Sequence, residues 1–199
     1  MNTNKSVRFF DEQFQRQVAA HDLHLNPFEA AALPHLRGRV LDFGCGLGNL
    51  SVTAAKKGCV VVALDGSHAA IEHLRSVAKR DGLQVQADEA DLRAYEVRDD
   101  FDTVICIGLL MFFDCPTAFH QLSSLQAHVR PGGTLIINVL TEGTTYIDMF
   151  SPDEHCLFKP GDLCERLIGW ELLSYVQQEF SAPRNTVKVF ETAIARKPQ

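Results

Sequence analysis

The sequence predicts an α/β fold in which helices cover both faces of a doubly wound, mostly parallel sheet. Short apolar runs alternate along the chain with helical stretches, which is the order of elements that builds a parallel sheet. The first apolar run leads directly into a turn that contains three glycines. The last two runs are joined by a turn too short for a crossover, so these two strands must pair antiparallel. The chain of 199 residues suits one domain, residues 1–199, which is long enough to bury a sizeable core.

Two helices are expected before the first strand. Residues 9–18 carry apolar side chains at roughly helical spacing, and residues 28–33 do the same after Pro27, which fits the first turn of a helix. Both helices fall within residues 1–38.

The glycine turn follows a short apolar strand, residues 39–43, and precedes a helix that begins near Asn49. Three glycines at alternate positions allow the backbone to turn sharply and to approach a ligand closely: Gly44, Gly46 and Gly48. We therefore expect this turn to seat a small molecule.

The spacing of the turn indicates which ligand. A dinucleotide-binding turn has a third glycine where this chain has Asn49, and Asp42 would repel a pyrophosphate. Asp65 ends the next strand, residues 59–64, at the distance expected for a carboxylate that accepts hydrogen bonds from ribose hydroxyls. A ribose with a cationic tail suggests S-adenosylmethionine.

The later elements can be placed in order from apolar periodicity and turn residues. We expect a helix capped by Ser67 that ends at Arg80, further helices over residues 116–129 and 161–168, and strands over residues 83–87, 101–106, 134–140, 171–176 and 187–195. Residues 107–113 are too apolar for a surface loop and should line a pocket. Residues 141–160 lack periodicity, and they form either a lid over the site or an irregular surface connection.

The composition restricts the partners. A formal charge of −6 and a pI near 5.7 argue against nucleic acid and against an anionic membrane surface. The sequence shows neither an apolar stretch long enough to span a membrane nor a leader peptide, so we expect a cytoplasmic protein with a small-molecule partner. The oligomeric state cannot be predicted.

The six cysteines form no Cys-x-x-Cys pair. A zinc site is therefore not expected, a disulfide framework is unnecessary, and most of the thiols should be small core residues. His155, Cys156 and Cys164 could offer soft ligands, but without a further partner they make a poor metal site. We expect no metal.

Three motifs resemble those of class I S-adenosylmethionine-dependent methyltransferases: Val40–Gly48, Leu64–Asp65 and Ala90–Leu92. The resemblance implies a Rossmann-like seven-stranded sheet with an antiparallel last strand, and leading helices that close over the cofactor, with Phe14 either touching it or only anchoring the core. It implies that Asp91 accepts from the adenine amine and that Leu92 packs on the ring. The implied cofactor-binding residues are Asp42, Gly44, Cys45, Gly46, Gly48, Asp65, Gly66, Asp91, Leu92, Cys106 and Ile107. Enzymes of the class that methylate nucleic-acid bases carry an Asn or Asp, two prolines and an aromatic residue after the fourth strand, and this chain does not.

Further segments are similar to the tellurite-resistance methyltransferase family, TehB: Leu110–Phe112, Leu157–Leu163, Gly169–Glu171 and Phe190–Lys197. This resemblance implies a metalloid oxyanion, tellurite or selenite, as the methyl acceptor. The family has a longer segment between the last two strands with a His-Arg pair, whereas this chain retains Arg184 at a comparable place and Lys188 after it.

The acceptor decides which catalytic groups are needed. An anionic acceptor needs cationic donors, for which Arg184, Lys188, Lys159 and His155 are candidates, and a neutral one needs a base, His155 or His68. Each of these side chains could instead be a solvated charge, and we take Arg184 and His155 as the catalytic candidates. Three functions remain open: metalloid methylation, methylation of a thiol, arsenite or another small metabolite, and binding of S-adenosylmethionine without catalysis.

Overall fold

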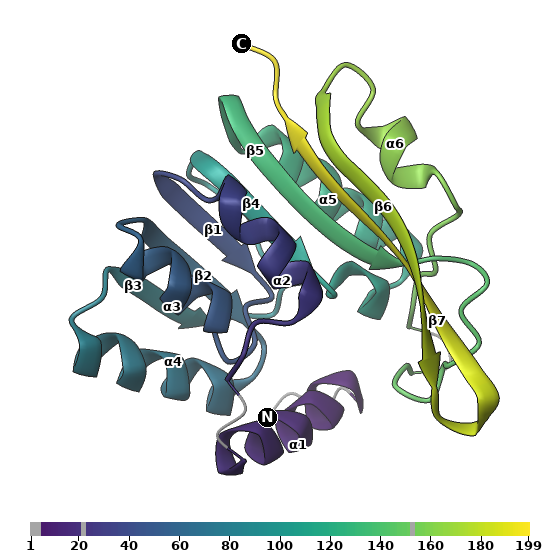
Figure 1. Ribbon diagram of the computed structural model, residues 1–199, viewed down its shortest axis with the longest axis horizontal. Coiled ribbons are helices and arrows are strands. Elements are labelled where there is room, and N and C mark those ends of the chain that lie inside the picture. Colours follow the sequence, from purple (N-terminus) through teal and green to yellow (C-terminus); the bar gives the residue numbers. More distant parts are fainter. Residues whose placement is uncertain (1–4, 21–22, 152–153) are drawn as a thin grey trace.

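The computed structural model describes residues 5–20, 23–151 and 154–199. Its centre is a seven-stranded sheet with the strand order β3-β2-β1-β4-β5-β7-β6 (Figure 1). The strands are β1 Arg39–Phe43, β2 Val60–Asp65, β3 Val85–Glu89, β4 Phe101–Ile107, β5 Val129–Leu140, β6 Glu171–Ala182 and β7 Thr186–Arg196. Strands β1 to β5 pair in parallel, and β7 pairs antiparallel with both β5 and β6. The predicted doubly wound sheet with an antiparallel last strand is confirmed.

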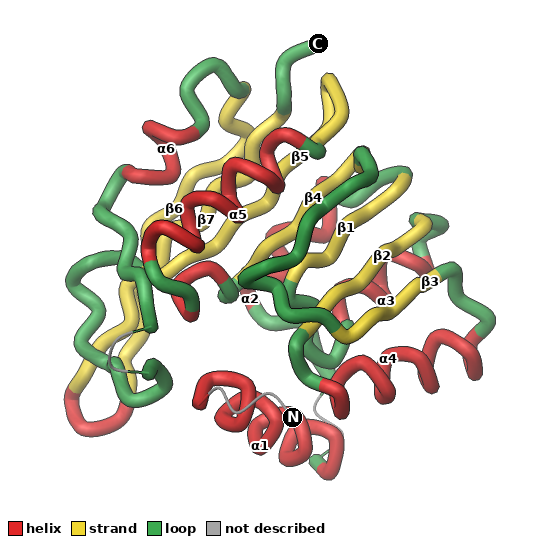
Figure 2. The backbone as a smooth tube through the Cα atoms, turned by 180° about the vertical axis from the view of Figure 1, so that it is seen from behind, coloured by secondary structure: helices red, strands yellow, loops and turns green. Residues whose placement is uncertain are grey.

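Helices cover both faces of the sheet. They are α1 Lys5–Ala19, α2 Pro27–Ala32, α3 Asn49–Lys56, α4 His68–Asp81, α5 Cys115–Ala127 and α6 Asp162–Arg166. Helices α2, α3 and α4 pack on one face, where Leu50, Ile71 and Leu74 share a core with Val61 and Ile136. Helix α5 crosses the other face, which is turned toward the viewer in Figure 2. Leu122 and Leu163 place α5 and α6 in the same core.

Local sequence explains where these helices begin. The side chain of Ser67 accepts a hydrogen bond from the Ala70 amide at 3.1 Å, which confirms it as the N-cap of α4. Asn26 and Glu29 form a capping box at α2, since each side chain bonds the backbone of the other. These caps fix both helices beside the carboxyl edge of the sheet.

The sheet differs from the sequence prediction in its last strands. Strand β6 continues to Ala182 instead of ending near Val176, and its pairing with β7 runs from Glu171–Arg196 to Ala182–Thr186. The extension was hidden because β6 is an edge strand whose mostly exposed residues do not show apolar alternation. Strand β5 likewise begins at Val129 instead of at residue 134 as predicted, and its register with β4 shifts near this start.

Residues 141–160 are tied to the rest of the fold by covalent and backbone bonds. Cys156 forms a disulfide with Cys115 at the start of α5, 41 residues away in sequence. The expectation that disulfides were unnecessary is therefore wrong, and Cys156 is not a soft metal ligand. Cysteine spacing could not show this, because the two positions meet only in the folded chain.

The described part of the chain has neither a metal-binding cluster nor a membrane-spanning helix. It contains no group of three or more His, Cys, Asp or Glu side chains arranged to hold a metal ion. None of its helices combines the length and the apolar character that a membrane crossing requires.

Candidate functional site

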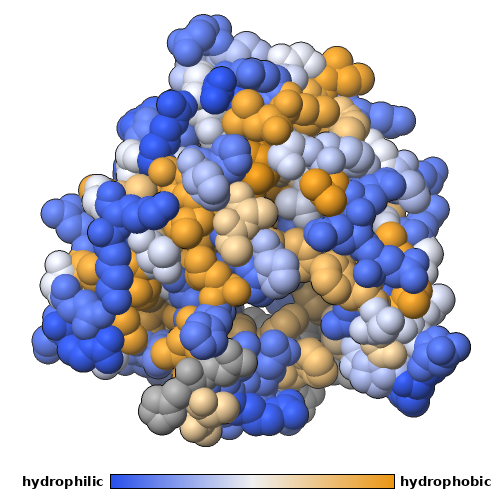
Figure 3. Space-filling view, in the orientation of Figure 1, coloured by the Kyte–Doolittle hydropathy of each residue, from blue (hydrophilic) through white to orange (hydrophobic). Residues whose placement is uncertain are grey.

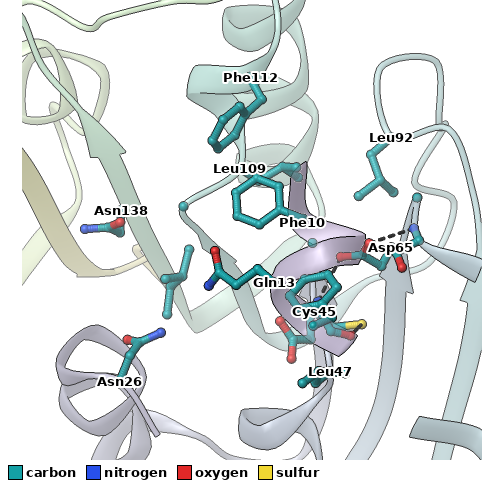
Figure 4. A pocket seen from close by; sticks show the side chains of 18 of the residues that line it. Phe10, Gln13, Asn26, Cys45, Leu47, Asp65, Leu92, Leu109, Phe112 and Asn138 are labelled. Carbon is teal, nitrogen blue, oxygen red and sulfur yellow. Dashed lines mark hydrogen bonds between the residues drawn. The ribbon is translucent and has the colours of Figure 1, made fainter. Parts of the chain in front are cut away.

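A cavity of about 530 Å³ lies at the carboxyl ends of β1, β2, β4 and β5. In the lower half of Figure 3, the surface is hollowed where α1 meets the rest of the molecule. Helix α1 contributes Phe10, Gln13 and Phe14 to the wall, and the glycine turn lines the same cavity. Figure 4 shows Phe10 and Gln13 near Cys45 of the turn. The volume is in the range of small-molecule sites.

The glycine turn is held by backbone bonds and by close packing. Gly44 donates to the Leu64 carbonyl at 2.8 Å, and Gly48 donates to the Cys45 carbonyl at 2.9 Å. All three glycines have positive φ, between 53° and 88°. A Cβ on Gly48 would lie 2.5 Å from Leu74 of α4, and one on Gly46 would lie 3.0 Å from the Phe14 ring. The glycines thus allow α4 and α1 to approach the turn, whereas the sequence predicted the close approach of a ligand alone.

Asp65 joins the glycine turn to helix α4. Its Oδ2 accepts from the Gly46 amide at 2.8 Å and its Oδ1 accepts from the Ser67 amide at 2.9 Å. Burial raises the pKa of the carboxyl group, and the two amides oppose that shift. A bound ligand would meet the remaining lone pairs of an oriented carboxylate.

Asp42 is the most deeply buried acid of the cavity wall. Its Oδ2 accepts the Ser51 hydroxyl at 2.6 Å, and only 5% of the residue is exposed. Burial raises the pKa of Asp42 to about 7, and repulsion from Glu29 and Asp65 adds to the shift. Burial also raises the pKa of Glu29, which lines the same wall. A cation placed here would favour the ionised carboxylates.

Asp91 and Leu92 line the cavity on the same side as Asp65. Arg93 donates from Nε and Nη2 to the two oxygens of Asp91 at 2.9 and 2.8 Å. This bidentate pair holds the pKa of Asp91 below its usual value, so the side chain is a carboxylate that is already partnered. Leu92 is 4% exposed and faces the cavity.

The structure brings most of the expected cofactor residues into one wall. Those that line the cavity are Asp42, Gly44, Cys45, Gly46, Gly48, Asp65, Gly66, Asp91, Leu92 and Ile107. Cys106 does not line it, because alternation along β4 turns its side chain into the core beneath α5 while Ile107 faces the site.

The two catalytic candidates lie outside the cavity wall. Arg184 sits at the tip of the β6–β7 hairpin, exposed, and forms an ion pair with Asp148. The His155 ring stacks on Phe150 with 4.9 Å between ring centroids, and its Nδ1 lies 3.3 Å from the Ser151 carbonyl. In this conformation neither side chain reaches the space beside the glycine turn.

The cavity confirms that residues 107–113 line a pocket, and it includes Lys188, one of the candidate cationic donors. The Nζ of Lys188 lies 4.9 Å from the centre of the Tyr146 ring, and burial lowers the pKa of this lysine. Sequence reasoning missed the other residues of the wall between β5, β7 and α1. Phe10 and Phe112 meet edge to face at 5.0 Å, and Phe28 packs on Phe190 at 4.8 Å. Asn138 is fully buried in the same wall. The available signal was that Asn138 is the one strongly polar residue in the apolar run 135–140.

Comparison with known proteins decides the kind of site. Residues 40–133 match a family model described as a methyltransferase domain. These residues are similar to a methyltransferase domain. The matched range begins in β1 and ends within β5, so it includes the glycine turn, Asp65 and Asp91.

Curated relatives match the chain over a longer range than the family model does. The chain is 29% identical over 168 residues to Hemagglutinin 1 of Eikenella corrodens, which covers 80% of this chain and 55% of that protein. It is 24% identical over 166 residues to the probable S-adenosyl-L-methionine-dependent methyltransferase TehB of Haemophilus influenzae, covering 80% and 57%. The chain thus spans little more than half the length of these curated relatives.

Solved structures share the whole architecture. The crystal structure of TehB from Haemophilus influenzae has a TM-score of 0.75 at 21% identity, covering 87% of this chain and 62% of that one. The N-methyltransferase NodS from Bradyrhizobium japonicum WM9, solved with S-adenosyl-L-homocysteine, has a TM-score of 0.70 at 18% identity, covering 94% and 98%. The chain has the class I S-adenosylmethionine-dependent methyltransferase fold.

The residues of the cavity fit the cofactor that proteins of this fold use. S-adenosylmethionine carries a ribose, an adenine and a sulfonium cation. The cavity offers an oriented carboxylate at Asp65, an apolar wall at Leu92 and Ile107, a buried acid at Asp42 and a half-buried acid at Glu29. Each group therefore has a partner of suitable chemistry in one cavity.

Proposed function

We propose that the protein transfers the methyl group of S-adenosylmethionine to a small-molecule acceptor. The observation that carries this proposal is the position of Asp65, held by the Gly46 and Ser67 amides in the wall that also contains Asp42 and Asp91. A turn without a ligand would not need three carboxylates around one cavity, since their mutual repulsion and burial cost stability.

Each residue of the cofactor set has a task in this proposal. Asp65 and Gly66 hold the ribose, while Asp91, Leu92 and Ile107 flank the adenine. Asp42 and Glu29 provide negative potential for the sulfonium, and the turn residues Gly44, Cys45, Gly46 and Gly48 let the chain pass close to the cofactor. Cys106 supports Ile107 from the core.

The protein's residues promote the transfer by alignment and by exclusion of water. The cofactor supplies an activated methyl group, and displacement at its carbon needs an acceptor lone pair in line with the breaking bond. Phe10 and Phe14 of α1 cover the turn, and Phe112 and Phe190 close the far wall. An apolar enclosure of this kind keeps water from competing with the acceptor.

The lining favours an organic acceptor. The half of the cavity beyond the turn is built mainly from aromatic and aliphatic side chains. The basic groups that line the whole cavity, among the described residues, are His24, Lys188 and the Asp91-paired Arg93. A hydrated oxyanion would have to exchange its water for several cationic donors. The aromatic half suits instead a molecule with an apolar body.

A metalloid oxyanion is the second candidate, because TehB is similar to this chain in both sequence and structure. In this alternative Lys188 would hold tellurite or selenite together with Arg184 and His155. Arg184 would have to leave Asp148, and His155 would have to leave the Phe150 ring.

The deciding experiment measures release of S-adenosylhomocysteine from labelled S-adenosylmethionine by the purified protein. The acceptor panel contains tellurite, selenite, arsenite, thiols, amines and phenols. Release that depends on an acceptor supports the proposal, and the identity of that acceptor separates the two candidates. Asp65→Ala is the site control and should weaken cofactor affinity by about 1 to 3 kcal/mol, whereas Asp88→Ala, outside the cavity, should not. Cofactor binding without release for any acceptor would indicate a binding protein.

A further inference from the structure

Asn138 is a buried amide with only one of its ends bonded. Its Nδ2 donates to the Thr192 Oγ1 at 2.9 Å and faces the Glu191 carbonyl at 3.5 Å. Because a backbone carbonyl can only accept, this contact identifies the nitrogen end of the amide. The Oδ1 of Asn138 is buried and has no hydrogen-bond partner within the described residues. Such an acceptor costs stability unless a ligand supplies a donor.

The free oxygen belongs to the cavity wall. Asn138 lines the same cavity as the glycine turn, on the side opposite Asp65 and Leu92 (Figure 4). It pairs with Ile107 of β4, and β4 also pairs with β1 through Asp42 and Ile105. Two strand spacings, about 10 Å, therefore separate β5 from the strand that leads into the turn. This places Asn138 across the cavity from the expected position of the cofactor.

The surroundings of Asn138 are apolar. Leu140 and Phe190 follow as the next register pair on the same face of the sheet, and Phe10 and Phe112 approach from α1 and from the segment after β4. The ammonium of Lys188 lies over the Tyr146 ring. A molecule in this half would contact aromatic surface on several sides and the Oδ1 of Asn138, while Gln13 and Asn26 contribute further amides to the same cavity.

We infer that the methyl acceptor is an aromatic amine that is uncharged at neutral pH, and that Asn138 accepts a hydrogen bond from its N–H. This inference rests on the proposed function. An amide oxygen orients a donor but does not take up its proton, so the acceptor atom must be able to attack while it keeps its hydrogen. An amine nitrogen can do so, whereas a hydroxyl must lose its proton to become a good nucleophile.

The step balances without another reactant. The nitrogen lone pair forms the new N–C bond as the bond between the methyl group and the sulfonium sulfur breaks, and the electrons of the broken bond stay on sulfur. The nitrogen briefly carries an extra positive charge, which strengthens its hydrogen bond to Asn138. It then passes one proton to water and leaves as the N-methylamine.

Matched probes separate the amine from the alternatives. Aniline, 4-methylaniline and N-methylaniline are compared with phenol and 4-methylphenol, which have the same ring but an O–H donor, and with tellurite. Binding of each probe to protein saturated with S-adenosylhomocysteine is measured by calorimetry, and turnover is measured by S-adenosylhomocysteine release. We expect the anilines to bind and to be methylated in preference to the phenols and tellurite.

Variants test the role of Asn138 itself. Asn138→Leu removes the acceptor and should weaken aniline binding by about tenfold or more, while S-adenosylmethionine affinity stays unchanged. Asn138→Asp keeps an oxygen acceptor and should retain most of the binding. Gln121→Leu removes another buried amide with an unpartnered oxygen, outside the cavity, and should leave binding unchanged.

The outcomes distinguish this inference from the proposed function. Methylation of phenols or tellurite but of no aniline would overturn it, as would equal aniline affinity in wild type and Asn138→Leu. A protein that binds S-adenosylmethionine but none of the anilines would also contradict it. Failure of the wild type to bind S-adenosylmethionine would instead reject the proposed function.

Discussion

At the scale of single residues, Asp42 is an acid whose burial disfavours its charged form. The carboxyl group is buried, and its pKa of about 7 in the folded protein compares with an ordinary value of 3.8. The folded state therefore binds a proton more tightly than the unfolded chain does between these two values. The preferential protonation of Asp42 in the folded state makes its full contribution to the free energy of unfolding below about pH 4. This contribution is lost as the pH rises to about 7.

This sign gives a pH prediction. We expect Asp42→Asn to gain stability relative to the wild type as the pH rises from 5 to 8. The difference in the free energy of unfolding between the two proteins should shift by about 2 to 3 kcal/mol in favour of the variant. The asparagine carries no charge to bury at either pH. Urea unfolding of both proteins at several pH values measures the difference. A difference that is independent of pH would show that Asp42 is not buried as a charge.

Single residues also show what the sequence could predict. Asp42 and Asp65 were found because they stand at fixed distances from a glycine turn, and local spacing survives folding. Asn138 was not selected because its neighbours read as an ordinary buried strand. Arg184 and His155 were selected by charge, which carries no information about where a hairpin tip or a connecting segment will point.

At the scale of elements, the disulfide links the segment after β5 to helix α5. Backbone bonds hold the same segment at both ends, since Thr141 donates to Val189 at 2.9 Å and Phe158 donates to Leu140 at 3.0 Å. Met149 and Phe150 are buried, and Met149 lines the cavity. Met149 of the predicted lid thus belongs to the cavity wall in this conformation. Pro152 and Asp153 of the same segment lie outside the described residues, and the role of the segment as a lid stays a prediction.

Breaking the disulfide should destabilise the fold. Cys156→Ala frees a loop of 41 residues in the unfolded chain, and loop-closure entropy predicts a loss of about 4 kcal/mol. Denaturant unfolding of the oxidised proteins measures the loss, and wild type treated with a reductant should show a similar one. Cys164→Ala, at a free thiol, should lie within about 1 kcal/mol of wild type. Equal stability of Cys156→Ala and wild type would contradict the cross-link in solution.

At the scale of the whole molecule, topology explains why one site gathers residues from distant segments. The strand order reverses between β1 and β4, so the chain leaves β1 toward one edge of the sheet and returns at β4 toward the other. The crevice at such a reversal, beyond the carboxyl ends of the strands, is where open α/β sheets bind ligands. The alternation of elements predicted a doubly wound parallel sheet. It could not predict how α1 and the β6–β7 hairpin close the sides, because that depends on contacts such as Phe10 with Phe112.

The charge of the whole molecule should add to the selectivity of the cavity. The chain has a formal charge of −6, and Asp42, Glu29 and Asp65 concentrate negative charge at the cavity wall. S-adenosylmethionine has one more positive charge than S-adenosylhomocysteine and is otherwise closely similar, so the two ligands form a matched pair. Screening by salt should reduce attraction for the sulfonium more than for the neutral thioether.

We therefore expect the affinity for S-adenosylmethionine to fall by about threefold between 0.05 and 0.5 M sodium chloride, and the affinity for S-adenosylhomocysteine to fall clearly less. The titrations belong at pH 8, above the pKa of about 7, where Asp42 is mostly ionised. In Asp42→Asn the two ligands should respond to salt more alike, because the Asp42 carboxylate is missing from the wall. Equal salt dependence of the two ligands in the wild type would show that the acidic wall does not sense the sulfonium charge, and the cation-selective assignment of Asp42 would then be wrong.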